Sequence, residues 1–172
     1  MPRNVEVKTK LDDVNATHQR VKSMTNEPPI VLKQCDYFFN SIKGRLKLRV
    51  QEDAPCYLIY YERPNVAGPK LSDYSTTTVT NPDELKETLD KALGIRGKVQ
   101  KKRTLYMIGQ TRVHIDEVHG LGDYLELEVV LRDDETVEYG ERIAQNLIEQ
   151  LNIPKYVQIE CAYMDLLDKN NN

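Results

Sequence analysis

The chain of 172 residues lacks tryptophan and has only two phenylalanines and three cysteines, Cys35, Cys56 and Cys161. An odd number of widely spaced cysteines provides neither a disulfide framework nor the paired spacing of a zinc site. No apolar run approaches the roughly 20 residues of a membrane-spanning helix, and the N-terminus lacks the apolar core of a signal peptide. We therefore expect reduced thiols in a cytoplasmic protein that does not bind membranes.

The sequence also lacks an excess of positive charge, because 24 lysines and arginines face 27 aspartates and glutamates, a net charge of −3. This balance argues against nucleic acid as a partner. The chain contains no glycine-rich phosphate loop, no serine nucleophile elbow and no paired cysteine–histidine site. Any phosphate that binds here must therefore be held by side chains.

Alternating apolar and polar residues predict about eight strands, mostly joined by short turns. We expect strands at 5–10, 30–39, 45–51, 56–63, 72–80, 99–108, 111–118 and 124–131, and helices at 12–24, 82–93, 135–151 and near 160–168. The length fits a single domain over 1–168, followed by a frayed tail at 169–172. The fold class is α+β, with an antiparallel sheet. Eight strands would allow it to close into a β-barrel around one small ligand, with flanking helices.

Charged side chains are sorted strand by strand. Segment 45–50 places three cations (Arg45, Lys47 and Arg49) on one face and three apolar side chains on the other, because alternate residues of a strand point in opposite directions. Glu126 and Glu128 likewise share one face of their strand. An exposed strand with mixed charges would produce each pattern singly. Their repetition favours a sheet curled so that its charged face lines a ligand channel.

The acidic side chains of this face form a candidate metal site. Glu6, Asp116, Glu126 and Glu128 have the same inward parity on their strands. Carboxylates of this kind suit Mg²⁺ or Mn²⁺, which are bound by a few oxygen ligands together with substrate phosphates. A solvated strand face remains the alternative.

The cations form the complementary half of the same face. Arg45, Lys47 and Arg49 project together, as do Lys8 and Lys10, while Arg103 and Arg112 flank the hairpin at 99–118. Burying so many like charges is prohibitive unless an anion or carboxylates share the space, and a triphosphate is an anion of the right kind. A basic outer face is the alternative. His114 shares the inward parity, either as a general acid or base or as a hydrogen-bonded structural histidine.

Five segments together resemble the CYTH family, also called triphosphate tunnel metalloenzymes, which includes class IV adenylyl cyclases and thiamine triphosphatases. They are Asn4-Val5-Glu6-Val7-Lys8, Gln34-Cys35-Asp36-Tyr37-Phe38-Phe39, Gly44-Arg45-Leu46-Lys47-Leu48-Arg49, Lys101-Lys102-Arg103 and Leu121-Gly122-Asp123-Tyr124-Leu125-Glu126-Leu127-Glu128. Segments 60–64 and 68–74 are most similar to the branch of class IV cyclases. The resemblance covers nearly the whole chain.

The resemblance implies an eight-stranded antiparallel tunnel that grips a triphosphate with lysines and arginines and binds a divalent metal on its acidic side. Glu6, Glu126 and Glu128 would be metal ligands supported by Asp116, and Glu6 and Lys8 would serve catalysis. Substrate-binding residues would be Lys8, Lys47, Arg49, Arg103 and Arg112, with Arg45, Arg63 and Lys70 as further candidates. From its strand parity alone, we expect Lys10 to bind substrate as well. We expect replacement of Lys47 or Arg49 by methionine to be neutral or stabilising without ligand, because it relieves like-charge repulsion.

One departure from the family pattern is Asn4, which stands where the family's Glu-x-Glu-x-Lys motif has its first glutamate. The loss of a charge weakens metal binding, so we expect one divalent ion completed by bound phosphate. The leading hypothesis is metal-dependent hydrolysis of a triphosphate, namely inorganic tripolyphosphate, thiamine triphosphate or a nucleotide. A class IV adenylyl cyclase and a polyphosphate- or nucleotide-binding module remain alternatives, and a homodimer is left open.

Overall fold

The computed structural model describes residues 2–154, 158–159 and 162–171. The strands are β1 (Arg3–Lys10), β2 (Ile30–Phe39), β3 (Arg45–Gln51), β4 (Cys56–Glu62), β5 (Lys70–Val79), β6 (Ile95–Ile108), β7 (Thr111–Val118), β8 (Gly122–Leu131) and the short β9 (Gln158–Ile159). The helices are α1 (Val14–Ser23), α2 (Pro82–Leu93), α3 (Val137–Gln150) and α4 (Tyr163–Asn171).

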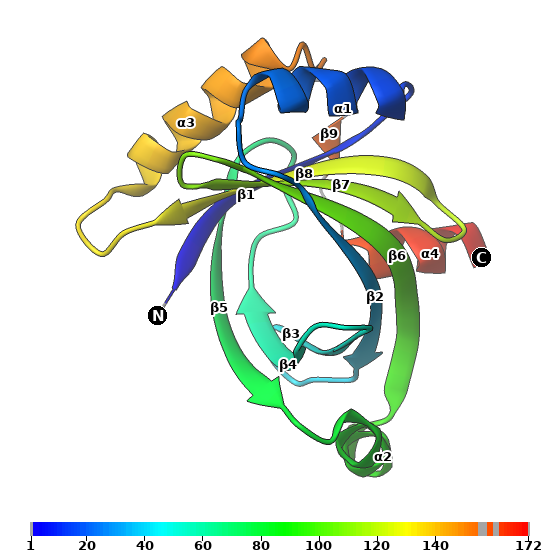
Figure 1. Cartoon of the computed structure of the whole chain (residues 1–172). Helices are drawn as coiled ribbons and strands as arrows, with labels where there is room; N and C mark the ends of the chain where they lie inside the picture. The colour runs from blue at the N-terminus through cyan, green and yellow to red at the C-terminus, as the bar shows by residue number, and fades with distance from the viewer. Residues whose placement is uncertain (1, 155–157, 160–161, 172) are drawn as a thin grey trace.

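Strands β1 to β8 form a closed antiparallel barrel (Figure 1). Neighbouring strands follow the order β5-β4-β3-β2-β6-β7-β8-β1. Strand β1 closes the ring, because it pairs with β8 along its whole length and with β5 over residues 3–6. The two-residue β9 continues the β5 side of β1. The prediction of an eight-stranded antiparallel barrel with flanking helices is confirmed.

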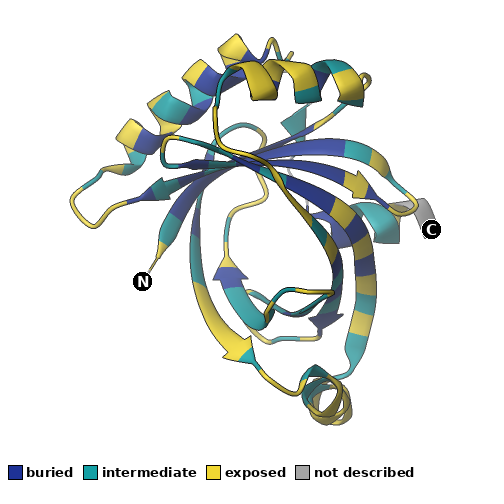
Figure 2. Cartoon of the chain, viewed as in Figure 1, coloured by how far each residue is buried: buried dark blue, intermediate teal, exposed yellow. Residues whose placement is uncertain are grey.

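The apolar core lies outside the barrel wall, between strands β1, β7 and β8 and the helices α1 and α3 that cover them (Figure 1). Val7, Leu127 and Ile148 are among its members, each 2% exposed or less. Figure 2 shows these strands as buried beneath helices whose other face is exposed. Since alternate residues of a strand face opposite ways, an apolar outer face leaves the barrel interior to the polar side chains of the same strands.

The other two helices cover different parts of the barrel. Helix α2 packs against β2 and β3, while α4 packs against β6. A second apolar cluster joins α4 to the ends of the strands and includes Phe38, Val99, Tyr124, Tyr163 and Met164. In the described part of the chain no helix is long and apolar enough to cross a membrane.

The predicted element boundaries agree closely with the structure, with differences where pairing extends a strand. Strand β6 begins at Ile95, four residues before its predicted start, because it continues to pair with β2 as far as Phe39. Strand β5 begins at Lys70, which pairs with Glu6 of β1. The hairpin across Gly109 is confirmed by the pairing of Ile108 with Thr111.

The C-terminal helix differs from its prediction at its end. Helix α4 continues to Asn171, three residues beyond its predicted end at 168, while the fraying expected of 169–172 stays a prediction. Arg96 of β6 is paired with both Asp165 and Asp168, and these contacts hold the helix against the barrel. The predicted start at 160 and Cys161 lie outside the described residues, while Cys35 and Cys56 are free thiols.

Gly140 shows how closely α3 packs on the barrel. A methyl group at this position would lie 2.7 Å from both Leu131 Cδ2 and Val5 Cγ2. Gly140→Ala should therefore lower the free energy of unfolding by about 1–3 kcal/mol, although alanine normally stabilises a helix interior by about 0.5–1 kcal/mol over glycine. Urea denaturation would measure this, with the exposed Glu141→Ala as a near-neutral control. Equal or greater stability of Gly140→Ala would contradict the close packing.

Candidate functional site in the barrel interior

The barrel encloses a cavity of about 410 Å³ that is lined mainly by inward-facing polar side chains. Seven cationic side chains line it: Lys8, Lys47, Arg49, Arg63, Lys101, Arg103 and Arg112. Four carboxylates line it as well: Glu6, Asp36, Glu126 and Glu128. Counted as fully charged, the groups of the lining would carry three more positive than negative charges, in a chain whose net charge is −3. The buried Asp116, which pairs with Arg103 behind the lining, reduces this excess to two. The charged residues of β1, β3, β7 and β8 were expected to share one cavity. All of them line it except Lys10, Arg45 and Asp116.

A buried carboxylate, Asp36 of β2, organises the cationic wall. Arg49 donates two hydrogen bonds of 2.8 Å to its two oxygens, from Nε to Oδ1 and from Nη2 to Oδ2. Lys101 Nζ lies 3.0 Å and Lys47 Nζ 3.1 Å from Oδ2. Burial alone would raise the pKa of Asp36, but Arg49, Lys101 and Lys47 together hold it well below its usual value. One carboxylate thus fixes three cations on β3 and β6.

The two lysines of this wall are easily deprotonated. Burial, together with Arg49 and Arg103, lowers the pKa of Lys47 to about 8 against the opposing effect of Asp36. Burial and the same cationic neighbours lower the pKa of Lys101 to about 7. An anion placed among these groups would favour their charged forms.

Arg103 of β6 is held by Asp116 of β7. Two hydrogen bonds of 2.7 Å join its Nε and Nη2 to Asp116 Oδ1 and Oδ2, and the Tyr163 hydroxyl donates to Oδ2 at 2.7 Å. Burial would raise the pKa of Asp116, but Arg103 outweighs it and lowers the pKa to about 2. Asp116 is fully buried and does not line the cavity. Both oxygens of Asp116 are engaged by Arg103, and its supporting part in the metal set stays a prediction.

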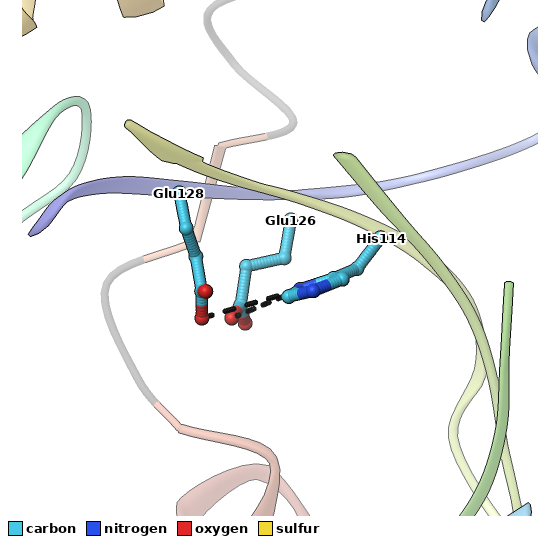
Figure 3. Close-up of side chains that lie close together, drawn as sticks. All are labelled: His114, Glu126 and Glu128. Atoms are coloured by element: carbon cyan, nitrogen blue, oxygen red, sulfur yellow. Dashed lines mark ion pairs between the residues drawn. The ribbon is translucent and has the colours of Figure 1, made fainter. Parts of the chain in front are cut away.

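His114, Glu126 and Glu128 of β7 and β8 form a compact group in the cavity lining (Figure 3). One donor atom from each lies within 4.8 Å of the others. His114 Nδ1 is 3.8 Å from Glu126 Oε1 and 4.0 Å from Glu128 Oε1, and it is buried without a hydrogen-bond partner. Two carboxylates beside an orphaned imidazole nitrogen could hold a divalent ion.

Glu6 and Lys8 of β1 border this group. Lys8 Nζ lies 3.3 Å from Glu126 Oε2 and 3.8 Å from the centre of the Tyr163 ring. Burial lowers the pKa of Lys8, and Glu126 partly offsets this effect. Glu6 accepts a hydrogen bond of 3.0 Å from Arg63. Burial, followed by repulsion from Glu126 and Glu128, raises the pKa of Glu6 to about 7.

Arg112 and Asn4 lie where β7, β8 and β1 meet. Arg112 Nε donates to Glu128 Oε2 at 2.8 Å. With the Asn4 amide oriented so that its oxygen faces Arg112, that oxygen accepts from Arg112 Nη2 at 3.2 Å. The residue that departs from the family motif is thus a buried member of the cavity wall.

Three predicted substrate-binding residues do not line the cavity. Lys10 is exposed at the end of β1. Arg45 has the inward parity but turns toward α4, where it pairs with Asp165 at 2.7 Å. Lys70 is buried beside the cavity and donates to the carbonyl oxygen of Val66 at 3.0 Å. Side-chain direction at the strand ends decides these three positions, and strand parity does not reveal it.

The sequence argument missed Asp36, Lys101 and Tyr163 as site residues. Asp36 and Lys101 stood inside the family-like segments and had inward parity, so the register between β2 and β6 would have identified them. Tyr163 lay in a predicted helix to which the sequence argument assigned no functional role. Only the folded chain brings its ring over Lys8.

Comparison with known proteins identifies the family of the chain that forms this cavity. The family model described as the CYTH domain matches residues 2–163. The chain belongs to the CYTH family. A Methanocaldococcus jannaschii protein named "Putative adenylate cyclase" is 26% identical over 175 residues, which cover 94% of this chain and 97% of that protein.

Solved structures of distant relatives share the fold. A Pyrococcus horikoshii protein has a TM-score of 0.84 at 18% identity, with 95% of this chain and 98% of that chain covered. A protein from Hippeastrum, named a "Putative adenylyl cyclase" and described as having a dominant triphosphatase activity, has a TM-score of 0.69 at 14% identity over 97% of this chain and 96% of its own.

The arrangement around Asp36 changes the stability expected of its variants. Asp36→Asn would leave Lys47, Arg49 and Lys101 without their shared carboxylate, and we expect a loss of about 3–5 kcal/mol in the free energy of unfolding. Arg49→Met removes both hydrogen bonds to Asp36 and should cost about 1–3 kcal/mol. This loss of stability replaces the neutral or stabilising effect that the sequence predicted for Arg49→Met. Lys47→Met should still change the free energy of unfolding little. Urea denaturation of the three variants tests this order, and a neutral Asp36→Asn would contradict it.

Proposed function

We propose that this protein hydrolyses a triphosphate substrate inside the barrel with the help of a divalent metal ion. The observation that carries this proposal is a cavity whose lining has three more cations than carboxylates and also contains the group of His114, Glu126 and Glu128. A neutral ligand would leave that excess uncompensated, whereas a triphosphate of about four negative charges would offset it.

Each part of the cavity wall has a role in the proposed reaction. Lys47, Arg49 and Lys101 would bind phosphate oxygens, and Arg103 would do so from the position that Asp116 fixes. Positive charge held at these oxygens favours phosphoryl transfer, because catalysis of that step is mostly positioning and charge stabilisation. A water molecule would attack the terminal phosphorus as the bond to the bridging oxygen breaks. Lys8 would take the water's proton.

The acidic side of the cavity fits a divalent cation. Glu126 and Glu128 would hold Mg²⁺ or Mn²⁺ through carboxylate oxygens, and the unpartnered Nδ1 of His114 offers a further ligand atom. A divalent ion supplies charge neutralisation at the phosphates and acidifies a bound water. Glu6, beside this group and paired with Arg63, is a further candidate ligand.

The same phosphate-binding side chains would serve cyclisation of ATP, in which the ribose 3′-hydroxyl attacks the α-phosphorus and pyrophosphate leaves. The name of the Methanocaldococcus jannaschii relative favours this second function. The description of the Hippeastrum protein favours hydrolysis. The two reactions differ in their products, so one assay separates them.

The test is incubation of the protein with ATP, tripolyphosphate and thiamine triphosphate, each with Mg²⁺ or Mn²⁺. We expect free phosphate from at least one substrate. Cyclic AMP without free phosphate would assign the cyclase reaction instead. Binding detected by the heat it releases, without turnover of any substrate, would indicate that the protein is a binding module and not an enzyme.

Glu126→Gln separates metal binding from phosphate binding. We expect Mn²⁺ to bind at least about tenfold more weakly and hydrolysis to be lost, while tripolyphosphate still binds because the cationic wall is unchanged. Calorimetric titration of Mn²⁺ and of tripolyphosphate measures the two effects. The control is Glu117→Gln, an exposed carboxylate on β7. If Glu126→Gln binds Mn²⁺ as wild type does, the metal assignment is wrong.

The pKa of about 7 for Lys101 predicts a pH-dependent affinity. A bound polyanion requires the charged amine, which the free protein loses as pH rises above 7, so affinity for tripolyphosphate should fall between pH 7 and 9, by up to about tenfold per unit. Lys101→Met should make this dependence shallower and leave the part contributed by Lys47, whose pKa is about 8. Lys102→Met, on the exposed face of the same strand, should retain it. Ionisation of the ligand itself contributes equally to all three proteins. An unchanged slope in Lys101→Met would refute the prediction.

A further inference from the structure

The acidic side of the cavity contains a nitrogen donor beside two carboxylates. His114 is 4% exposed, and its Nδ1 has no hydrogen-bond partner among the described residues. This nitrogen faces one oxygen of each glutamate, Glu126 Oε1 at 3.8 Å and Glu128 Oε1 at 4.0 Å (Figure 3). A buried polar atom without a partner is costly and calls for an explanation. The three donor atoms thus face one another without forming a hydrogen bond.

The other oxygen of each glutamate is held by a cation. Lys8 Nζ lies 3.3 Å from Glu126 Oε2. Arg112 Nε donates to Glu128 Oε2 at 2.8 Å. Arg103 Nη2 is 4.0 Å from Glu126 Oε1, which is too far for a hydrogen bond. Each carboxylate is therefore oriented with one oxygen bound to a cation and the other turned toward the imidazole.

The spacing and the chemistry of these donor atoms fit a transition-metal ion. In zinc sites, for example, nitrogen and carboxylate ligands lie about 2.0–2.2 Å from the ion, so two ligands are at most about 4.4 Å apart. The distances of 3.8 and 4.0 Å from His114 Nδ1 fall within that limit. Mg²⁺ takes oxygen ligands in nearly ideal octahedral geometry, whereas imidazole suits transition-metal ions. One nitrogen and two oxygens therefore favour a transition-metal ion over Mg²⁺.

We propose that His114 Nδ1 is a metal ligand and makes this site selective for a divalent transition-metal ion, such as Mn²⁺ or Co²⁺, over Mg²⁺. This inference rests on the proposed function and specifies the class of its metal ion. Glu126 and Glu128 contribute one oxygen each, and these oxygens alone would suit Mg²⁺ as well. The imidazole nitrogen determines the selectivity, because Mg²⁺ gains little from a nitrogen ligand.

Electron spin-echo spectroscopy of the wild-type protein loaded with Mn²⁺ tests the contact directly. An imidazole bound to Mn²⁺ couples its nitrogen nucleus to the electron spin of the ion, whereas carboxylate and water ligands offer no nitrogen. We therefore expect nitrogen modulation of the echo from wild type and none from His114→Gln. A wild-type echo without nitrogen modulation would overturn the inference, and this measurement needs neither a variant nor catalytic activity.

His114→Gln replaces the imidazole by an amide, whose oxygen suits Mg²⁺. In calorimetric titrations the variant should bind Co²⁺ at least about tenfold more weakly than wild type. It should bind Mg²⁺ within about threefold of wild type, because both glutamates remain. His119→Gln is the matched control, since His119 is exposed on the turn between β7 and β8, and it should bind both ions as wild type does. A His114→Gln protein that keeps the wild-type preference for Co²⁺ would overturn the inference.

Turnover separates this inference from the proposed function. Hydrolysis of a triphosphate by wild type whose bound Mn²⁺ shows no nitrogen modulation refutes the inference alone. Nitrogen modulation in a protein that hydrolyses none of the three triphosphates supports the inference and refutes the proposed hydrolysis. Failure of wild type to bind Mn²⁺, with or without tripolyphosphate, refutes both.

Discussion

The carboxylate of Asp36 is the interaction on which the interior of this barrel depends. It is 1% exposed and shared by Lys47, Arg49 and Lys101 from two different strands. An isolated buried ammonium or guanidinium group would cost several kcal/mol, and three of them side by side would be worse. One carboxylate cannot neutralise three cations, so it holds them in place and leaves two charges uncompensated. The proposed triphosphate would offset this positive charge.

The same principle operates around the rest of the wall with different partners. Asp116 and the Tyr163 hydroxyl fix Arg103, Glu6 fixes Arg63, and Glu128 fixes Arg112. Each pair positions a guanidinium group whose pKa stays high despite burial, whereas the pKa of the buried lysines falls. Arginines therefore supply permanent charge, while the charge of Lys47 and Lys101 changes with pH near neutrality. An anion that binds the folded state alone would also stabilise it.

The apolar packing that supports this interior lies outside it. Strand β1 is buried over six consecutive residues, because its apolar side chains pack under α3 while its polar ones face the cavity. The close approach of α3 at Gly140 and the contacts of α4 with Arg45 and Arg96 hold the charged strands in register. The apolar packing thus lies on the outer face of the wall, and the charged groups of the candidate site lie on its inner face.

The sequence by itself determined the strands, their in-and-out parity and the sorting of charge, because a period of two assigns every side chain to a face. It therefore predicted the barrel, the inward Lys47, Arg49, Glu126 and Glu128, and the resemblance that the family match confirms. Which charged side chains pair with each other in the interior depended on the register between strands and on the position of helix α4. The in-and-out parity of the strands specifies neither. The tertiary structure alone decided that Asp116 serves Arg103, that Arg45 turns to Asp165 and that Gln34 keeps an unpartnered oxygen. These outcomes follow from distances between segments that are far apart in the chain, and only the folded chain sets those distances.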